Sequence, residues 1–317
     1  MTSPYEIDEI FPEDSPGSVR LPRRQAGNSP QGLAVTLMAD YTLRTRAWLP
    51  TAAIVTLLAE AGVSPAGART AISRLARRGV LEGRRQGRHS SYRLTTAAAA
   101  FLAIGGSAIL VASDAPPWDG QWTLIAFSMP QEEGNSRRGL RDQLRWMGYA
   151  PLYDGLWISP HDLSAKTRAR LAELTLGTLT VFRAGHVELD AAVRRNPLDA
   201  WDTEEIARQY EAFIRRWRPA VPRSRGGDVA GTDAVRARTE VMDTYRRLPI
   251  LDPHLPLRLL PRGWLREPAR DLFVAVYDGL ADTAENHVRA VASRYTEGEV
   301  SGIQAHTVAD LATGLGR

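Results

Sequence analysis

The chain of 317 residues contains no cysteine, and this absence excludes several kinds of chemistry. Without cysteine there are no disulfides, no thiolate metal ligands and no cysteine nucleophile. No apolar run is long enough to span a membrane, because Gly105 and Gly106 interrupt the apolar stretch of residues 97–112. Lysine is nearly absent as well, with Lys166 the only one, so almost all positive charge is arginine.

Recognisable catalytic motifs are also absent. The sequence has no Gly-x-Ser-x-Gly, no phosphate-binding loop and no Gly-x-Gly-x-x-Gly after a predicted strand. The six histidines are scattered, and His186 with Glu188 supplies fewer ligands than the three or four that a metal site requires. We therefore expect no catalytic residue, no metal, no cofactor and no enzymatic activity.

The N-terminal region, residues 1–28, is rich in proline and acidic residues. It lacks the basic start and the apolar stretch of a secretory signal peptide. We expect a disordered tail over residues 1–28, a cytoplasmic protein and no membrane partner. The chain as a whole has an ordinary globular composition, with 44% hydrophobic residues, and its length predicts more than one domain.

The most informative stretch is residues 51–95, which predicts two helices and a two-stranded hairpin. Apolar residues at positions 54, 57, 58 and 61 form one face of a first helix, which Gly62 ends. Ser64 is a suitable N-cap for the second helix, with Pro65 at its first position. A strand then begins at residues 80–81, turns over residues 86–89 and returns over residues 91–94.

The second helix, residues 65–78, has two chemically different faces. Ala68, Ile72 and Leu75 share an apolar side that we expect to be core. The opposite side carries small, polar and basic residues: Ala66, Arg69, Thr70, Ser73 and Arg77, with Arg74 at its edge. Arginine can bind guanine through two hydrogen bonds, and serine and threonine can reach bases or phosphates. This face predicts a helix that enters the major groove of DNA.

Charge in this region has one sign. Between residues 44 and 93 the cations are Arg44, Arg46, Arg69, Arg74, Arg77, Arg78, Arg84, Arg85, Arg88 and Arg93. The only anions are Glu60 and Glu82, although the whole chain has a net charge of only +4. Such local basicity on this pattern favours a binder of double-stranded DNA over a merely solvated helix face. The candidate DNA-binding residues are Ser64, Ala66, Arg69, Thr70, Ser73, Arg74, Arg77, Arg84, Arg85, Arg88 and His89.

The order of predicted elements gives an α+β, multidomain fold. Residues 29–113 form a winged helix-turn-helix domain, with a first helix over residues 31–41 and a last one over residues 97–110. Residues 118–195 follow the strand, helix, two-strand hairpin, helix, strand plan (βαββαβ) of a ferredoxin-like domain. Residues 196–317 form an α-helical C-terminal domain, with a Pro/Gly-rich break at residues 219–231 and one or two final helices over residues 266–292.

Four stretches resemble the PaaX family of bacterial transcriptional repressors, which control phenylacetate catabolism and related pathways. They are residues 62–81, residues 87–95, residues 122–160 and residues 245–264, the last reading Tyr-Arg-Arg-Leu-Pro-Ile-Leu-Asp-Pro-His-Leu-Pro at its start. The resemblance implies a winged helix, a ferredoxin-like middle domain related to the CRISPR-associated Cas2 fold, and a helical C-terminal domain. It also implies a homodimer and an acyl-CoA effector, which is phenylacetyl-CoA in the namesake proteins.

An effector with phosphates and an apolar acyl end needs arginines beside an aromatic-lined cleft. Trp201, Arg215, Arg216, Trp217 and Arg218 have that composition and are the candidate effector-binding residues. The alternative is that these arginines only complement the dipole at a helix end.

Two other functions remain open. The first alternative is a protein related to the Cas2-type nucleases but without a retained active site. Those nucleases place a metal-binding aspartate near the end of the first strand, where this chain has Ser128, which cannot supply that ligand. The second alternative is an RNA-binding protein, in which Phe127 and Phe182 would stack on bases from an open sheet face. Both phenylalanines can equally be core residues.

Overall fold

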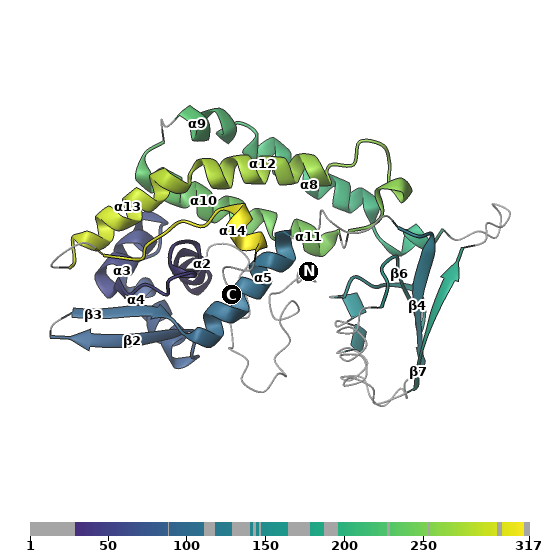
Figure 1. Cartoon of the computed structure of the whole chain (residues 1–317), viewed down its shortest axis with the longest axis horizontal. Coiled ribbons are helices and arrows are strands. Elements are labelled where there is room, and N and C mark those ends of the chain that lie inside the picture. Colours follow the sequence, from purple (N-terminus) through teal and green to yellow (C-terminus); the bar gives the residue numbers. More distant parts are fainter. Residues whose placement is uncertain are drawn as a thin grey trace. The chain divides into compact units, whose positions relative to one another are not determined.

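The computed structural model describes residues 29–87, 89–110, 118–128, 140–141, 144–145, 147–163, 178–186, 196–226, 229–252, 254–296 and 300–313. Contacts divide the chain into two compact units. The first unit contains the N-terminal helices and hairpin, Ala212–Arg247 and the region from Arg266 onward. The second contains Asp114–Glu211 and Leu248–Leu265. Figure 1 shows the elements of each unit.

The N-terminal part of the first unit contains the predicted helices and hairpin. Its elements are α2 (Pro30–Thr42), β1 (Leu49–Pro50), α3 (Thr51–Glu60), α4 (Pro65–Arg77), β2 (Leu81–Gln86), β3 (His89–Leu94) and α5 (Thr96–Leu110). The three strands form an antiparallel sheet in the order β1-β3-β2. Helix α4 packs against α2 and α3, and its buried side consists of Ala68, Ala71, Ile72 and Leu75. The apolar face predicted for this helix is therefore confirmed.

Local sequence explains where these helices begin and end. The hydroxyl oxygen of Ser29 accepts a hydrogen bond of 3.0 Å from the backbone N–H of Gly32 at the start of α2. Ser64 does the same for α4, accepting from Gly67 N–H at 3.1 Å, and Pro65 follows at the first helical position. Between α3 and α4, Gly62 has a φ of +85°, a conformation that glycine adopts without steric cost.

The C-terminal helices complete the first unit. They are the end of α8 (Thr203–Trp217), α9 (Ala220–Gly226), α10 (Gly231–Tyr245), α12 (Arg266–Gly279), α13 (Ala281–Ser293) and α14 (Val308–Ala312). Helix α10 packs along α13 and touches α2, while α13 touches α3 and α14 packs on α5. The interior of this unit is thus shared between helices that lie far apart in the sequence.

One local prediction in this region was wrong. The expected break at residues 219–231 contains the seven-residue helix α9. Proline is compatible with a helix here because Pro222 lies in the first turn, where backbone N–H groups have no partner within the helix. The buried Ser224 hydroxyl donates to the Val221 carbonyl at 2.9 Å and packs against Gly279 of α12.

A four-stranded antiparallel sheet forms the centre of the second unit. Its strands are β4 (Gln121–Ser128), β5 (Ala150–Tyr153), β6 (Leu156–Ser159) and β7 (Thr178–Gly185), in the order β5-β6-β4-β7. The two strands of the predicted hairpin, β5 and β6, are joined by a turn at Asp154-Gly155, in which Gly155 has a φ of +77°. The unit also contains short helical turns, η2 (Pro197–Ala200), α11 (Leu248–Leu251) and η3 (Leu257–Leu259).

Both faces of this sheet are covered. One face carries a buried cluster that includes Ile125, Phe127 and Trp157, with Leu140 and Leu144 packed on it. The other carries Trp122, Leu152 and Ile158, which are covered by Trp118, Leu198, Trp201 and Leu259. Each face therefore carries a buried apolar cluster, while Phe182 of β7 (Thr178–Gly185) is exposed.

Several predictions lie outside the described residues. These are the tail over residues 1–28, position Arg88 and most of the two helices expected within residues 118–195. Within the ranges that the structure does describe, no helix has the length and apolar character needed to cross a bilayer.

Candidate nucleic-acid interface

The outer side of α4 presents the residues predicted to reach DNA. Ala66, Arg69, Thr70, Ser73, Arg74 and Arg77 are all exposed, as is the N-cap Ser64. Within the described part of the chain, no carboxylate forms an ion pair with Arg69, Arg74 or Arg77. Among the described residues, therefore, no acidic side chain neutralises these three guanidinium groups, and their charge suits an anionic partner.

Two hydroxyl groups on this helix already make internal hydrogen bonds. The Thr70 hydroxyl donates to the Ala66 carbonyl at 2.9 Å, and the Ser64 hydroxyl accepts from Gly67 N–H. A hydroxyl has one donor and two acceptor positions. Thr70 can therefore still accept a hydrogen bond from a base or sugar, whereas Ser64 can still donate one to a phosphate.

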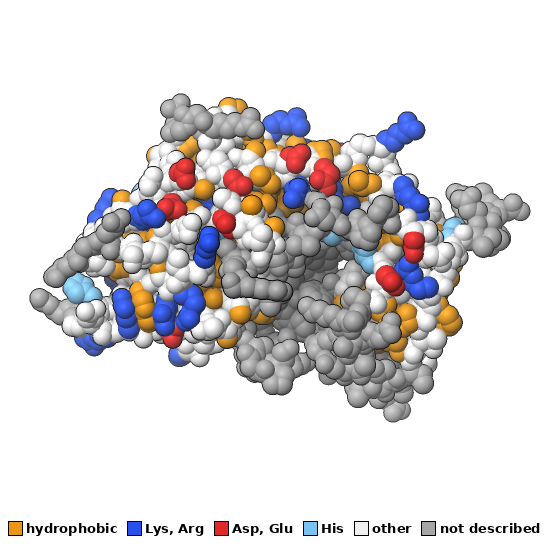
Figure 2. Space-filling model, in the orientation of Figure 1, with side chains coloured by type: hydrophobic (Ala, Val, Ile, Leu, Met, Phe, Trp, Pro, Cys, Tyr) orange, Lys and Arg blue, Asp and Glu red, His pale blue; other side chains and the backbone are white. Residues whose placement is uncertain are grey.

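The β2–β3 hairpin separates its arginines between two faces. Register pairs Glu82 with Arg93 and Arg84 with Ser91, so Glu82, Arg84 and Arg93 share one face. Arg85 pairs with Ser90 on the opposite face. Figure 2 shows arginine side chains gathered over this hairpin, with few acidic groups among them. His89 is exposed at the start of β3.

Trp48, just before β1, contacts the hairpin face that carries Arg84 and Arg93. The guanidinium carbons of Arg84 and Arg93 each lie 4.5 Å from the centroid of its ring, within cation–π distance. Sequence reasoning did not select Trp48. The sequence shows only a large aromatic residue near arginines. That pattern does not distinguish a residue of the core from one that holds a basic surface in place.

The two local anions are both engaged away from α4. Glu82 accepts hydrogen bonds from Arg46 at 2.5 Å and Arg93 at 2.7 Å. Glu60 lies 2.8 Å from the Nε2 atom of His287 on α13. Arg46 and Arg93 are thus partly neutralised, while Arg69, Arg74 and Arg77 on α4 have no such partner in the described ranges. The positive surface is centred on the helix and on Arg84 and Arg85 of the hairpin.

Comparisons with known proteins match most of the chain. Family models match three consecutive parts of the chain: "PaaX-like protein" at residues 29–98, "PaaX protein central Cas2-like domain" at residues 115–194 and "PaaX-like protein C-terminal domain" at residues 201–290. The chain is also 30% identical over 245 residues to "Transcriptional repressor PaaX" of Escherichia coli (strain K12), covering 75% of each protein.

The chain belongs to the PaaX family. The resemblance found in the sequence is therefore confirmed, and the middle segment is Cas2-like. The relative with a named function is a transcriptional repressor and not an enzyme. The fold is also similar to that of the uncharacterized protein Rv0674 from Mycobacterium tuberculosis. The TM-score is 0.54 at 21% identity, over 82% of this chain and 96% of that one.

Inside the PaaX-family Cas2-like segment, the residues behind the two alternative functions can now be placed. Ser128 is exposed at the end of β4, opposite Thr178 of β7. Phe127 is buried at 9% exposure in one face of the sheet, whereas Phe182 is 52% exposed. Phe182 pairs with Leu124, and Phe127 pairs with Leu179, so the two rings belong to opposite faces. They cannot form one stacking surface.

The candidate effector residues are divided between the units. Trp201 lies in the second unit, where its ring stacks 6.2 Å from Trp122. Trp217 is buried in the first unit and donates from its indole N–H to the Thr244 hydroxyl at 3.0 Å. Arg216 forms an ion pair of 2.8 Å with Glu240, and Arg215 and Arg218 are exposed. A ligand role for these five positions stays a prediction.

Proposed function

We propose that the chain is a DNA-binding transcriptional repressor whose α4 helix reads the major groove and whose β2–β3 hairpin lies along the phosphates. In this proposal α3, the turn at Gly62 and α4 are the helix-turn-helix of a winged domain over residues 29–113. The exposed Arg69, Arg74 and Arg77, which form no ion pair with any described residue, carry the proposal. Kinship with a protein named as a transcriptional repressor supports it.

The second unit supports a ferredoxin-like assignment for residues 118–195. The strand order β7-β4-β6-β5 places the first strand of the segment beside its last, and the hairpin returns at the other side. This is the strand order of a βαββαβ chain, in which each strand–helix–strand unit leaves room for one strand of the other unit between its own two strands. Residues 196–317 are then the helical C-terminal domain. In this proposal the C-terminal domain supports the DNA-binding domain or binds the effector, and the regulator is cytoplasmic.

The DNA proposal is tested with single alanine substitutions. Arg77→Ala should lower affinity for the specific site by about 1–3 kcal/mol and relax base preference, as loss of a bidentate base contact does. Arg85→Ala should weaken binding to all sequences alike and reduce the salt slope by about 0.9, because it removes one phosphate contact. Binding is measured by fluorescence anisotropy at several salt concentrations, with specific and scrambled duplexes.

The matched control is Arg236→Ala, which removes an exposed arginine of α10 that is paired with Asp233. It should leave both the affinity and the salt slope unchanged. Equal, sequence-independent losses for Arg77→Ala and Arg85→Ala would show that α4 does not contact bases.

We further propose a homodimer that binds an inverted repeat. One winged module reads few base pairs, and two-fold symmetry doubles the sequence that is read. The half-site centres should be separated by about one or more helical turns, roughly 10–10.5 base pairs each. Light scattering at micromolar concentration, with and without DNA, measures the mass; a monomer in both conditions contradicts the proposal.

Repression is proposed to end when a small effector, an acyl-CoA thioester of the phenylacetyl-CoA type, binds the state that cannot hold DNA. A ligand with equal affinity for both states shifts nothing, so the effector must favour the DNA-free state. A thermal-shift screen of thioesters and free acids, followed by a DNA-release assay, tests this part. The predicted operon is a catabolic one because the namesake family controls such pathways.

A further inference from the structure

Residues 301–306, which we call the C-terminal strap, lie between the N-terminal and the C-terminal helices of the first unit. The strap belongs to the yellow coil that leads to α14 in Figure 1. The side chains of Ile303 and His306 are 0% and 1% exposed, so they are part of the interior. The strap is therefore a packed part of the unit and not a loose end of the chain.

Helix α13 holds the strap from the C-terminal side. The carboxylate of Glu285 accepts a hydrogen bond of 2.8 Å from the backbone N–H of Ala305. Arg289, one turn later in α13, donates to the Ile303 carbonyl from Nε at 3.2 Å and from Nη2 at 2.8 Å. Hydrogen bonds in which one partner is ionised are stronger than those between neutral groups. The backbone of the strap is thus fixed to α13.

On its other side the strap is hydrogen-bonded to the end of α2. The backbone N–H groups of Gln304 and His306 donate to the carbonyls of Tyr41 and Asp40, at 2.9 and 3.2 Å. Both carbonyls lie in the last turn of α2, where a helix has no further N–H group of its own to offer them. The strap therefore supplies partners that the end of α2 needs.

The strap also contacts the α2–β1 loop, residues 43–48. The Thr45 hydroxyl donates to the Gly302 carbonyl at 2.5 Å. Gly302 has a φ of +83°, and a Cβ atom added to it would lie 3.3 Å from the Cβ atoms of both Thr45 and Ala47. Because this contact leaves little room for a side chain, the position of the strap determines the position of the loop.

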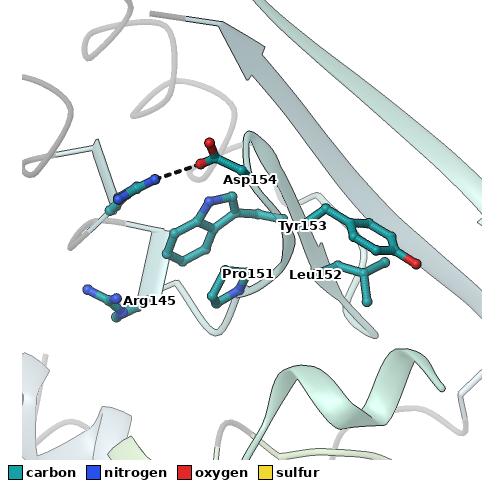
Figure 3. A pocket seen from close by; sticks show the side chains of 7 residues that line it. Arg145, Pro151, Leu152, Tyr153 and Asp154 are labelled. Atoms are coloured by element: carbon teal, nitrogen blue, oxygen red, sulfur yellow. Dashed lines mark hydrogen bonds and ion pairs between the residues drawn. The ribbon is translucent and has the colours of Figure 1, made fainter. Parts of the chain in front are cut away.

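The same loop is bonded to the β2–β3 hairpin through Arg46. Its Nε atom donates to the Leu94 carbonyl at 3.0 Å, and its Nη2 atom binds Glu82. Arg46 has a φ of +51°, which is unfavourable for a residue with a side chain. Glycine takes this conformation in other turns, as Gly155 does beside Asp154 in the β5–β6 hairpin (Figure 3). The shape of the α2–β1 loop therefore depends on its contacts with the hairpin and the strap.

We propose that the C-terminal strap positions the basic face of the β2–β3 hairpin for DNA through the α2–β1 loop. Trp48, at the end of this loop, lies 4.5 Å from the guanidinium carbons of Arg84 and Arg93. Helix α13 holds the strap, the strap holds the loop and the loop holds the hairpin, so strap residues act as positioning residues that touch no DNA. This rests on the proposed function, because it requires that the hairpin contacts DNA.

Gly302→Ala in the full chain tests the proposal, because its methyl group displaces the loop. Affinity for specific and scrambled duplexes, measured by fluorescence anisotropy, should fall alike by roughly two- to tenfold, since the hairpin contacts phosphates. Thr45→Val, which removes the hydrogen bond to the strap, should lower affinity in the same way. In a Trp48→Leu background, Gly302→Ala should cost less than about a further twofold, because both changes act on one hairpin face.

The matched control is Gly263→Ala in the second unit. Gly263 has a φ of +80°, so alanine meets the same backbone strain there as at Gly302, but no described atom lies within 4 Å of the added carbon. Thr313→Val is the control for Thr45→Val, because the Thr313 hydroxyl donates to the Ala309 carbonyl of its own helix. Both controls should keep wild-type affinity for DNA. Urea unfolding checks that every variant is folded.

Two results overturn the role of the strap: equal losses in Gly302→Ala and Gly263→Ala, or full multiplication of the losses when Gly302→Ala is combined with Trp48→Leu. Wild-type affinity in Thr45→Val also overturns it, and this variant decides alone if Gly302→Ala does not fold. If Arg84→Ala and Arg85→Ala bind both duplexes as wild type does, the hairpin does not contact DNA. That part of the proposed function then fails, and the role of the strap fails with it.

Discussion

Trp48 illustrates how a single residue can determine the shape of a charged surface without itself carrying charge. It contacts the guanidinium groups of Arg84 and Arg93. Glu82 then binds Arg93 from the same hairpin face. An arginine that is already held in one orientation loses less conformational entropy when it binds a phosphate. Trp48 is therefore expected to act as a positioning residue for the hairpin.

Substitution of Trp48 by leucine should weaken DNA binding by roughly two- to tenfold, because about 0.5–1.5 kcal/mol of side-chain ordering is then needed on binding. The salt slope should hardly change, since Arg84 still reaches its phosphate. Arg84→Ala should instead lower the slope by about 0.9, which separates positioning from contact. Trp48→Phe keeps a weaker cation–π contact and should lie between wild type and leucine. Wild-type affinity in Trp48→Leu contradicts the positioning role.

At the scale of the element, helix α4 combines a structural and a binding role at its N-cap, Ser64. Ser64 caps the helix and is exposed on the proposed DNA-binding side. Ser64→Ala should lower the free energy of unfolding by about 0.5–2 kcal/mol through loss of the cap. Ser64→Asp keeps a capping oxygen and suits the helix dipole, so stability should hold, while its carboxylate repels phosphate and DNA affinity falls.

Ser29 supplies the matched control, because it caps α2 with the same geometry, accepting from Gly32 N–H at 3.0 Å. Ser29→Asp should keep both stability and DNA affinity. Urea unfolding and anisotropy measure the two quantities separately. If Ser64→Ala and Ser64→Asp lose the same amount of DNA affinity, the carboxylate has no specific effect at this position.

Elements were predictable where their signals are local. Gly62, Ser64 and Pro65 set the turn and the start of α4 through backbone conformation and one hydrogen bond, and Asp154-Gly155 marks the hairpin in the same way. The packing partners were not predictable, because an apolar stripe does not specify which helix covers it. The contacts of α10 and α13 with α2 and α3 are of this kind.

The environment of a charged residue is subject to the same limit. In the sequence, Arg236 and Arg238 are equivalent arginines of one helix. In the structure Arg236 is exposed and Arg238 is fully buried. Likewise, nothing in the sequence distinguishes Arg145, whose guanidinium stacks on Trp157, from other exposed arginines. Stacking and burial depend on residues brought together by the sheet and the helix packing, and periodicity does not report them.

At the scale of the whole molecule, the interior of the first unit contains a polar cluster that joins its N-terminal and C-terminal helices. Arg238 of α10 donates to the backbone carbonyls of Tyr277, at 2.5 Å, and of His306. The Tyr277 hydroxyl donates to the carboxylate of Asp40 in α2 at 2.8 Å. The backbone N–H of His306 donates to the backbone carbonyl of Asp40 at 3.2 Å. The cluster ties α2 to α10, α12 and the segment before α14.

Burial affects the two titratable groups of this cluster in opposite directions. It raises the pKa of the Asp40 carboxyl from 3.8 to about 6, against the attraction of Arg238. It lowers the pKa of the His306 imidazole from 6.5 to about 4, and Arg238 adds to that effect. Both groups therefore favour their neutral forms in the folded protein, and both couple folding to pH between about 4 and 6.5.

The two couplings have opposite signs. The stability contributed by Asp40 is present below pH 3.8 and is lost as pH rises through about 6, because the unfolded carboxyl ionises first. The stability contributed by His306 is present above pH 6.5 and is lost as pH falls through about 4, because the unfolded imidazole is protonated first. In the wild-type protein the two slopes partly cancel across this window.

Removing one of the two groups at a time should therefore change the pH dependence of the free energy of unfolding in opposite directions. Relative to wild type, Asp40→Asn should gain stability as pH rises from 4 to 6, and His306→Asn should lose it, each by up to about 1.4 kcal/mol per pH unit. Urea unfolding at pH 4, 5, 6 and 7 measures the slopes, with the exposed His186→Asn as a control that should follow wild type. Since an overall loss of stability shifts a curve without tilting it, only the slopes decide. If the free energies of unfolding of Asp40→Asn and His306→Asn both run parallel to that of wild type across this pH range, Asp40 and His306 do not titrate differently in the folded and unfolded states.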